Sequence, residues 1–185
     1  AYDDYTYTHS LNVAALGVMP PGGGEPVFYD ASGQAVPGDG LCPESCRQAF
    51  VAPARLGHIA LGRAFSPASG PFAGRRLLVM TMPLADEAGR VGGLALVVDA
   101  QAVAGRYAHN VRSGETGYAW VIDDAGVFLD HHEADFIGRE SLTVRRQRDP
   151  GIDWSRLEWL IKDRVMLGER GMDWYYSGWH RGRIR

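Results

Sequence analysis

One turn sequence occurs three times in this chain, and it strongly limits the folds that the chain can adopt. Residues 30–33, 86–89 and 123–126 each begin with Asp and end with Gly, and each lies between two apolar runs. The Asp side chain can accept hydrogen bonds from its own downstream backbone, and Gly tolerates a positive φ. Between β-rich runs this combination is typical of a hairpin. Three such hairpins in 185 residues predict antiparallel sheets, and their spacing indicates two sheet modules.

The pattern outside the hairpins predicts several helices. Residues 9–19 could be the C-terminal end of a helix that stops at the Pro- and Gly-rich residues 20–24. Residues 100–111 and 154–165 repeat apolar residues at helical spacing, so both are predicted helices. Residues 140–151 form a polar stretch for which we predict no element.

The order of the elements predicts one complete sheet and one incomplete sheet. Residues 25–99 supply five strands: two strands, a helical excursion, a third strand and a long hairpin. Residues 117–179 repeat only the opening of this series and end with an aromatic strand at 172–179. Both ends of the chain are abrupt, and we expect it to be a piece of a longer protein.

The composition suits a folded domain and argues against a nucleic-acid partner. Apolar residues make up 45% of the chain, enough for a hydrophobic core, and the formal charge of -3 leaves no basic footprint. The sequence has no run of about 18 apolar residues that would predict a transmembrane helix, and no signal peptide. Cys42 and Cys46 lie in a Pro- and Gly-rich loop. We favour a local disulfide in an oxidising compartment over free thiols or half of a metal site.

The order of the elements, with a linking helix between two halves, resembles the double Cache sensor domain of bacterial transmembrane receptors. Residues 65–99, which end in the phrase GLALVVD, are similar to the end of the membrane-distal Cache module. Residues 114–131 are similar to the start of the membrane-proximal module, and the phrase GETGYAWVID at 114–123 is the strongest part of the match. Residues 174–182 are similar to sensor histidine kinases of this type.

This resemblance implies an α+β fold of PAS-like antiparallel sheets flanked by helices. Residues 1–105 would form the membrane-distal Cache module, and residues 106–185 the membrane-proximal one, incomplete at its C-terminal end. The resemblance also implies the periplasmic part of a bacterial inner-membrane receptor, above all a two-component sensor histidine kinase. Such a receptor would be a homodimer with membrane helices outside this chain, and a disulfide between Cys42 and Cys46 agrees with that location.

Under the same resemblance, the distal module is the first place to expect a small-molecule ligand. Asp99 lies where many amino-acid-binding members have an Asp, and it could bind an amine; the alternative is that it caps the helix after it. Arg63, Met80 and Met82 could line the pocket, because strand residues of one parity share a face and Met adapts to varied ligands. Core and rim packing is the alternative for both Met. The Arg-x-Trp-Tyr phrase of amino-acid-binding members is absent from residues 46–63, so organic acids and amines are expected ligands beside amino acids.

A second candidate pocket lies near the end of the chain. Trp174 and Tyr176 share a strand face, and with Trp179, His180 and Arg181 they could hold an anionic organic ligand. The alternative is that these aromatic residues are core that lacks its partner strands.

The sequence predicts no metal, no cofactor and no catalytic residues. The densest metal-capable set is Asp-His-His-Glu-x-Asp at residues 130–135. Adjacent His residues on a strand point to opposite faces, so they cannot easily bind one metal ion. We therefore predict a surface turn here and not a metal site. A hydrolytic enzyme would need a Ser or Cys beside His58, His109 or His180, and no such pair is expected.

Two functions follow from the sequence. The first is a ligand sensor that passes a conformational signal across the membrane. The second is a periplasmic protein-interaction module of a chemoreceptor or cyclic-nucleotide signalling protein, which would lack an enclosed pocket and expose an apolar patch.

Overall fold

The computed structural model describes residues 13–22, 24–38, 40–41, 47, 56–115 and 117–176. The chain divides into two compact units, a first unit of Ala1–Arg106 and a second unit of Tyr107–Arg185. None of the described helices is long and apolar enough to cross a membrane.

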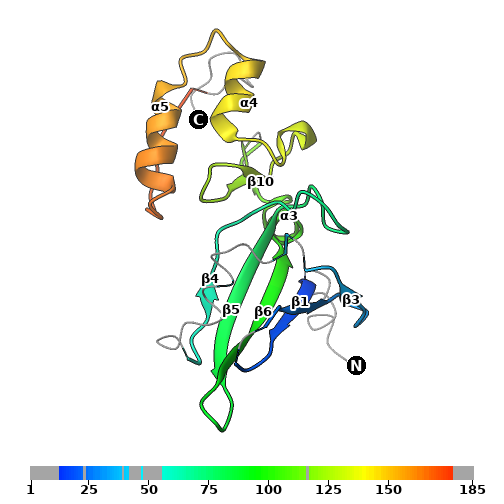
Figure 1. Ribbon diagram of the computed structural model, residues 1–185. Coiled ribbons are helices and arrows are strands. Elements are labelled where there is room, and N and C mark those ends of the chain that lie inside the picture. Colours follow the sequence, from blue (N-terminus) through cyan, green and yellow to red (C-terminus); the bar gives the residue numbers. More distant parts are fainter. Residues whose placement is uncertain are drawn as a thin grey trace, which may run out of the picture. The chain divides into compact units, whose positions relative to one another are not determined.

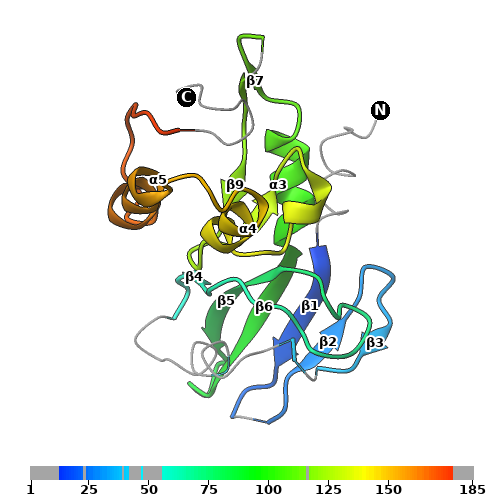
Figure 2. The ribbon, with the colours of Figure 1, turned by 90° about the horizontal axis from the view of Figure 1, so that it is seen from above.

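The first unit is built on a six-stranded antiparallel sheet with the order β3-β2-β1-β6-β5-β4. The long β5–β6 hairpin forms its centre together with β1, and the short β2–β3 hairpin lies beside β1 (Figures 1 and 2). The strands are β1 (Val13–Met19), β2 (Val27–Tyr29), β3 (Ala35–Val36), β4 (Ala60–Leu61), β5 (Leu77–Ala85) and β6 (Val91–Asp99). Helix α3 (Ala100–Ala108) follows β6 directly and leads the chain into the second unit.

The three predicted turns have the same geometry. In each turn the Asp Oδ1 accepts hydrogen bonds from the backbone N–H groups two and four residues later, at 2.8–3.0 Å. The closing glycines, Gly33, Gly89 and Gly126, have φ of 80°, 75° and 75°, a conformation that L side chains rarely adopt. The turns therefore close the β2–β3, β5–β6 and β9–β10 hairpins, as the sequence predicted.

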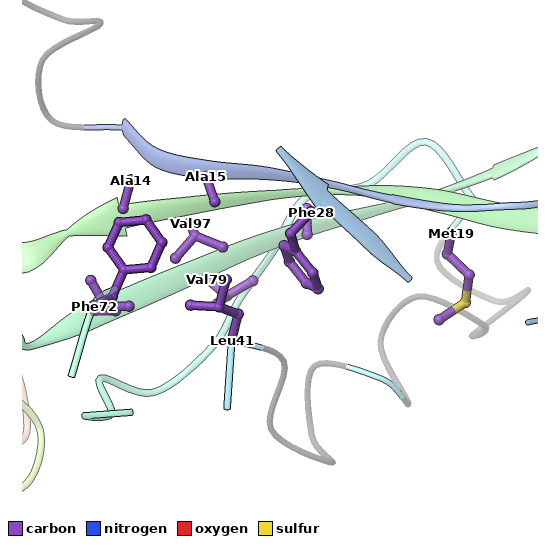
Figure 3. Packing of buried hydrophobic residues seen from close by; sticks show 10 residues of the cluster. Ala14, Ala15, Met19, Phe28, Leu41, Phe72, Val79 and Val97 are labelled. Carbon is purple, nitrogen blue, oxygen red and sulfur yellow. The ribbon is translucent and has the colours of Figure 1, made fainter. Parts of the chain in front are cut away.

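The core of the first unit lies on one face of the sheet. Phe28, Val79 and Val97 project from three strands, and Leu41 and Phe72 pack against them from loops (Figure 3). Strand alternation accounts for this face, because Leu77, Val79 and Thr81 of β5 are buried while the residues between them are half-buried. The α+β fold predicted from the sequence is thus observed, with one strand more than the five expected.

The additional strand is β1, where the sequence predicted a helix end. Residues 9–12 of that predicted helix lie outside the described residues, and Val13–Met19 is a strand between β2 and β6. Ala15 and Gly17 face the core, and a Cβ on Gly17 would lie 2.6 Å from Phe28 Cε1. Small residues are therefore needed here for close packing across strands, and a helical pattern read along the chain does not contain that information.

The described part of the second unit contains two short hairpins and two helices around its own core. Its strands are β7 (Arg112–Ser113), β8 (Gly117–Tyr118), β9 (Val121–Ile122) and β10 (Phe128–Asp130). A 3₁₀ turn, η2 (Ala134–Phe136), leads to α4 (Ser141–Arg148), and α5 (Ser155–Leu160) continues into a π-helical turn, η3 (Ile161–Val165). The buried hydrophobic residues are Phe128, Phe136, Leu142, Val144, Trp154, Leu157 and Ile161.

Three predictions for this part of the chain are corrected. Helix α4 occupies the polar stretch for which no element was predicted, and the Glu140 carboxylate caps it by accepting from the N–H groups of Leu142 and Thr143. Helix α3 ends at Ala108, and it buries Ala100 and Ala104 rather than a stripe of larger apolar residues. The described part of the predicted last strand, residues 172–176, contains one isolated bridge position and no continuous strand.

Candidate functional site

The register of the first sheet brings two opposite charges together at one of its ends. Asp99, the last residue of β6, pairs with Leu77, the first residue of β5. Arg75 precedes β5 by two residues, so it lies at the same end, and its Nη2 donates a hydrogen bond to Asp99 Oδ2. The Asp99 side chain is 7% exposed and that of Arg75 is 46% exposed. The ion pair therefore joins a buried carboxylate to a guanidinium that reaches solvent.

Asp99 also fixes the start of α3. Its Oδ1 accepts a hydrogen bond of 3.0 Å from the backbone N–H of Ala102, in the first turn of the helix. The carbonyl oxygen of Arg76 accepts from the N–H of Ala100 at 2.9 Å, and the N–H of Arg76 donates to Gln101 Oε1 at 3.3 Å. The helix-capping alternative considered for Asp99 is thus present, and the same carboxylate holds Arg75 through its other oxygen.

A cavity of about 410 Å³ opens beside this ion pair. Its volume lies within the usual range for small-molecule sites, roughly 300–1,000 Å³. The walls come from β1, the β2–β3 hairpin and the loop before β5, and they consist of Val13, Ala14, Asp30, Ala31, Ser32, Val36, Pro71, Phe72, Arg75 and Asp99. Apolar walls with a few convergent polar groups are typical of a site for a small polar molecule.

The polar groups of the cavity offer both donors and acceptors. Arg75 lies over the Phe72 ring, with Cζ 5.8 Å from the ring centroid, and one of its N–H donors is directed to Asp99. The pKa of the Asp30 carboxyl is below its usual range, first because the Ser32 hydroxyl donates to it and then because the Gln34 backbone N–H does. Asp30 is therefore ionised at neutral pH, and the cavity holds two carboxylates and one guanidinium.

The structure separates the other residues predicted for this pocket from Asp99. Met80 and Met82 alternate with the buried residues of β5, so they lie on the opposite face of the sheet. There they line an apolar groove of about 200 Å³ with Leu16, Ile59, Thr81, Leu94, Ala95 and Leu96. Arg63 is exposed beyond the end of β4, and it is not among the described residues that line the cavity beside Asp99.

The predicted aromatic pocket belongs to the second unit. Trp174 and Tyr176 are half-exposed, and their rings are perpendicular with centroids 5.9 Å apart. Arg156 lies over Trp174, with Cζ 5.2 Å from the ring centroid, and its guanidinium pairs with Asp173. Trp179, His180 and Arg181 lie outside the described residues, as do Cys42 and Cys46.

The predicted surface turn at residues 130–135 is corrected for its first two residues, which are buried, while residues 132–135 are exposed or half-buried. Asp130 is 3% exposed and His131 is 1% exposed, and the two His rings lie side by side at 4.6 Å rather than on opposite faces. The reason is that β10 ends at Asp130, so strand alternation no longer applies to the histidines. Burial lowers the pKa of His131 to about 3, with further contributions from His132 and Arg145.

No metal cluster is found in the described residues. They contain no group of three or more His, Cys, Asp or Glu that could hold a metal ion. His109 Nδ1 lies 3.3 Å from Asp130 Oδ1, so its recorded partner is a carboxylate and not a Ser or Cys. His180 lies outside the described residues.

Comparison with known proteins identifies the fold. No protein-family model matches the sequence, and no curated protein matches it. Among solved structures, the extracellular domain of mmHK1S-Z3, a protein assigned as a histidine kinase, superposes with a TM-score of 0.63 at 17% identity, over 97% of this chain and 68% of that one. The periplasmic sensory domain of the Campylobacter jejuni chemoreceptor Tlp1 gives a TM-score of 0.56 at 12% identity, over 99% and 67%.

A third structure, from a sensory box/GGDEF family protein of Vibrio parahaemolyticus, gives a TM-score of 0.56 at 14% identity, over 94% of this chain and 66% of that one. The chain has the fold of an extracytoplasmic sensor domain. The α+β fold that the sequence resemblance implied is thereby confirmed. The chain spans about two thirds of the length of each of these sensor domains.

Two residues in prominent positions were not found by sequence reasoning. Arg75 has no motif around it, and only the pairing of β5 with β6 places it beside Asp99. Arg145 lies in the polar stretch that was predicted to have no element, yet it is 3% exposed in α4. A search for amphipathic helices that accepted a basic residue on the buried face would have identified Arg145.

Proposed function

We propose that this chain is the extracytoplasmic sensor domain of a bacterial signal-transduction receptor, and that it binds a small polar organic molecule in the cavity beside Arg75 and Asp99. The observation that carries the proposal is the cavity itself, which lies at the end of the sheet and places a buried carboxylate and a partly exposed guanidinium on one wall. A sensor of this kind is periplasmic, functions as a homodimer and passes its signal through membrane helices outside this chain to an output domain such as a histidine kinase.

The ligand class follows from the two charges. Arg75 has N–H donors beyond the one directed to Asp99, so it can bind a carboxylate or another acceptor. Each carboxylate oxygen of Asp99 has two lone pairs, so it can accept from a ligand amine in addition to Ala102 and Arg75. A molecule with an amine, a carboxylate or both is therefore the preferred ligand.

The signal follows from the double role of Asp99. The carboxylate that faces the cavity also caps α3, the helix that leads the chain from the first unit into the second. A ligand that contacts Arg75 or Asp99 more favourably in one arrangement of this helix start shifts the population toward that arrangement. The sensor thus needs no catalysis in this chain.

A thermal-unfolding screen tests the proposal. The probes are L-serine, ethanolamine and succinate, which carry both groups, an amine and two carboxylates respectively, and a bound ligand raises the unfolding temperature by mass action. We expect a rise with at least one probe that is lost in Arg75→Met and Asp99→Asn but kept in Glu87→Gln, an exposed control in the same unit. A rise that both site variants retain would place the ligand elsewhere.

The readout can be made specific for the first unit. All 5 Trp residues lie at or after residue 120, so Trp fluorescence reports on the second unit. A transition that far-UV circular dichroism detects and Trp fluorescence does not detect therefore reports on the first unit. If no small molecule acts and a protein partner does, the interaction module becomes the better function.

A further inference from the structure

Helix α4 carries a buried arginine that the proposed function does not use. Arg145 is 3% exposed, whereas its neighbours Arg146 and Arg148 are half-exposed and pair with acidic residues. The guanidinium lies against two aromatic rings, with Cζ 5.1 Å from the centroid of Trp120 and 4.9 Å from that of Phe128. Since an arginine stays protonated in proteins, this is a positive charge inside the second unit.

No carboxylate forms an ion pair with this guanidinium in the described part of the second unit. There the guanidinium makes one hydrogen bond, from Nη1 to the carbonyl oxygen of Ser141 at 3.5 Å, and Arg145 has no ion pair. Glu140 attracts the guanidinium through space, but its described hydrogen bonds go to the N–H groups of Leu142 and Thr143, and its side chain does not pair with Arg145. The positions of the second unit outside the description, residue 116 and residues 177–185, contain no Asp or Glu.

A buried guanidinium without an ion-pair partner is unfavourable unless another group neutralises its charge. A charge removed from water loses its hydration, and cation–π contacts recover only part of that loss. Burial accordingly lowers the pKa of Arg145, while Tyr175, Tyr118 and Glu140 act in the opposite direction. His131 does not add a second charge, because burial keeps it neutral down to a pH of about 3.

A second buried polar group lies on the same side of α4. Ser141 is fully buried, and its Oγ has no hydrogen-bond partner in the described structure. Ser141 precedes Arg145 by four residues, so the two side chains lie one helical turn apart on one face. A hydroxyl and a guanidinium both donate to an anion, which makes Ser141 an independent sign of a missing acceptor.

We propose that Arg145 anchors a second ligand site, within the second unit, for a small organic monocarboxylate. A guanidinium matches a carboxylate with two parallel hydrogen bonds, and a single cation balances a single negative charge. The rings of Trp120 and Phe128 at the guanidinium suit the apolar body of such a ligand. This site is separate from the cavity beside Asp99 and does not depend on it.

Sodium benzoate and sodium acetate, with sodium chloride at equal ionic strength as the reference, test this site. Trp120 borders the guanidinium, so binding is followed by Trp fluorescence as well as by thermal unfolding. At ten times the dissociation constant we expect benzoate to raise the unfolding temperature of the second unit by about 5 °C or more. A response to chloride as large as that to both carboxylates would overturn the assignment.

Arg145→Met should abolish the benzoate response, while Arg146→Met, a change at an exposed position of the same helix, should keep it. Arg75→Met should also keep it, which separates this site from the cavity of the first unit. Arg145→Lys retains the charge but loses the paired donors, so we expect about tenfold weaker binding. Unchanged benzoate affinity in either Arg145 variant would refute the proposal, and if the Met variant does not fold, the Lys variant and the wild-type titration decide.

Discussion

Asp99 performs two tasks that substitution can separate. Its Oδ1 caps α3 through the N–H of Ala102, and its Oδ2 binds Arg75. Asn is as good a helix cap as Asp, so Asp99→Asn keeps the first task and removes the charge needed for the second. Asp99→Ala removes both. The difference in stability between the two variants therefore isolates the cap.

The expected magnitudes follow from the exposure of each partner. Because the Arg75 side chain is 46% exposed, water replaces its lost partner, and loss of the ion pair should cost about 0.2–1 kcal/mol. Loss of a cap costs about 1 kcal/mol, and the Ala variant should lose both contributions, about 1.2–2 kcal/mol in total. We thus expect Asp99→Ala to be about 1 kcal/mol less stable than Asp99→Asn.

Urea unfolding followed by both far-UV circular dichroism and Trp fluorescence measures these differences, because the transition that Trp fluorescence does not detect belongs to the first unit. The denaturant slope should be unchanged, since no compact region is lost. Native-state hydrogen exchange gives a local readout, because the Ala102 amide should stay protected in the Asn variant and exchange faster in the Ala variant. Glu87→Gln and Glu87→Ala are matched controls at an exposed position and should both lie within about 0.5 kcal/mol of wild type.

Equal stability of the two Asp99 variants would refute the capping argument. So would an Ala102 amide that exchanges equally fast in both. A loss well above about 1 kcal/mol in the Asn variant would instead show that the ion pair with Arg75 matters more than its half-exposed guanidinium suggests.

Two further predictions concern packing and pH. Gly17→Ala should lower the free energy of unfolding by about 1–3 kcal/mol, because the new Cβ would lie 2.6 Å from the Phe28 ring. In a Phe28→Leu background, urea denaturation should show a smaller loss of stability for the same substitution. Equal losses in the two backgrounds would contradict the steric reason. The pKa of His131 is about 3 in the folded chain and 6.5 in the unfolded one, so the unfolded chain binds more protons between these pH values. The stability of the second unit should therefore fall as pH is lowered through this range. In His131→Asn, which can still accept from the Glu133 N–H, Trp-monitored unfolding should show a shallower pH dependence than in the exposed control His58→Asn, and identical slopes would refute this.

The hairpins could be predicted from sequence because their information is local. In each turn, Asp Oδ1 bonds within four residues of itself, and the closing Gly adopts a positive φ. Strand β1 could not be predicted in this way. Its apolar residues were compatible with a helix end when read along the chain, and only the approach of Phe28 from the neighbouring strand accounts for Gly17.

Only part of the candidate site could be predicted from the sequence, because the rest depends on contacts between strands. The position of Asp99 at the end of a strand was visible through the resemblance, but its partner Arg75 depends on the β5–β6 register. Parity within one strand correctly placed Met80 and Met82 on one face. It could not show that Asp99 lies on the other, because that requires knowing that Asp99 pairs with Leu77.

The chemistry of Asp99 also limits how a ligand could signal. A ligand carboxylate binds the N–H donors of Arg75 that Asp99 does not use, and it leaves the cap on Ala102 in place. A ligand amine attracts the Asp99 carboxylate itself and therefore acts on the cap and the ion pair together. Because α3 begins at this carboxylate, an amine should change the exchange rate of the Ala102 amide more than a carboxylate of equal affinity does. The two ligand classes can thus be distinguished by their effect on one backbone hydrogen bond.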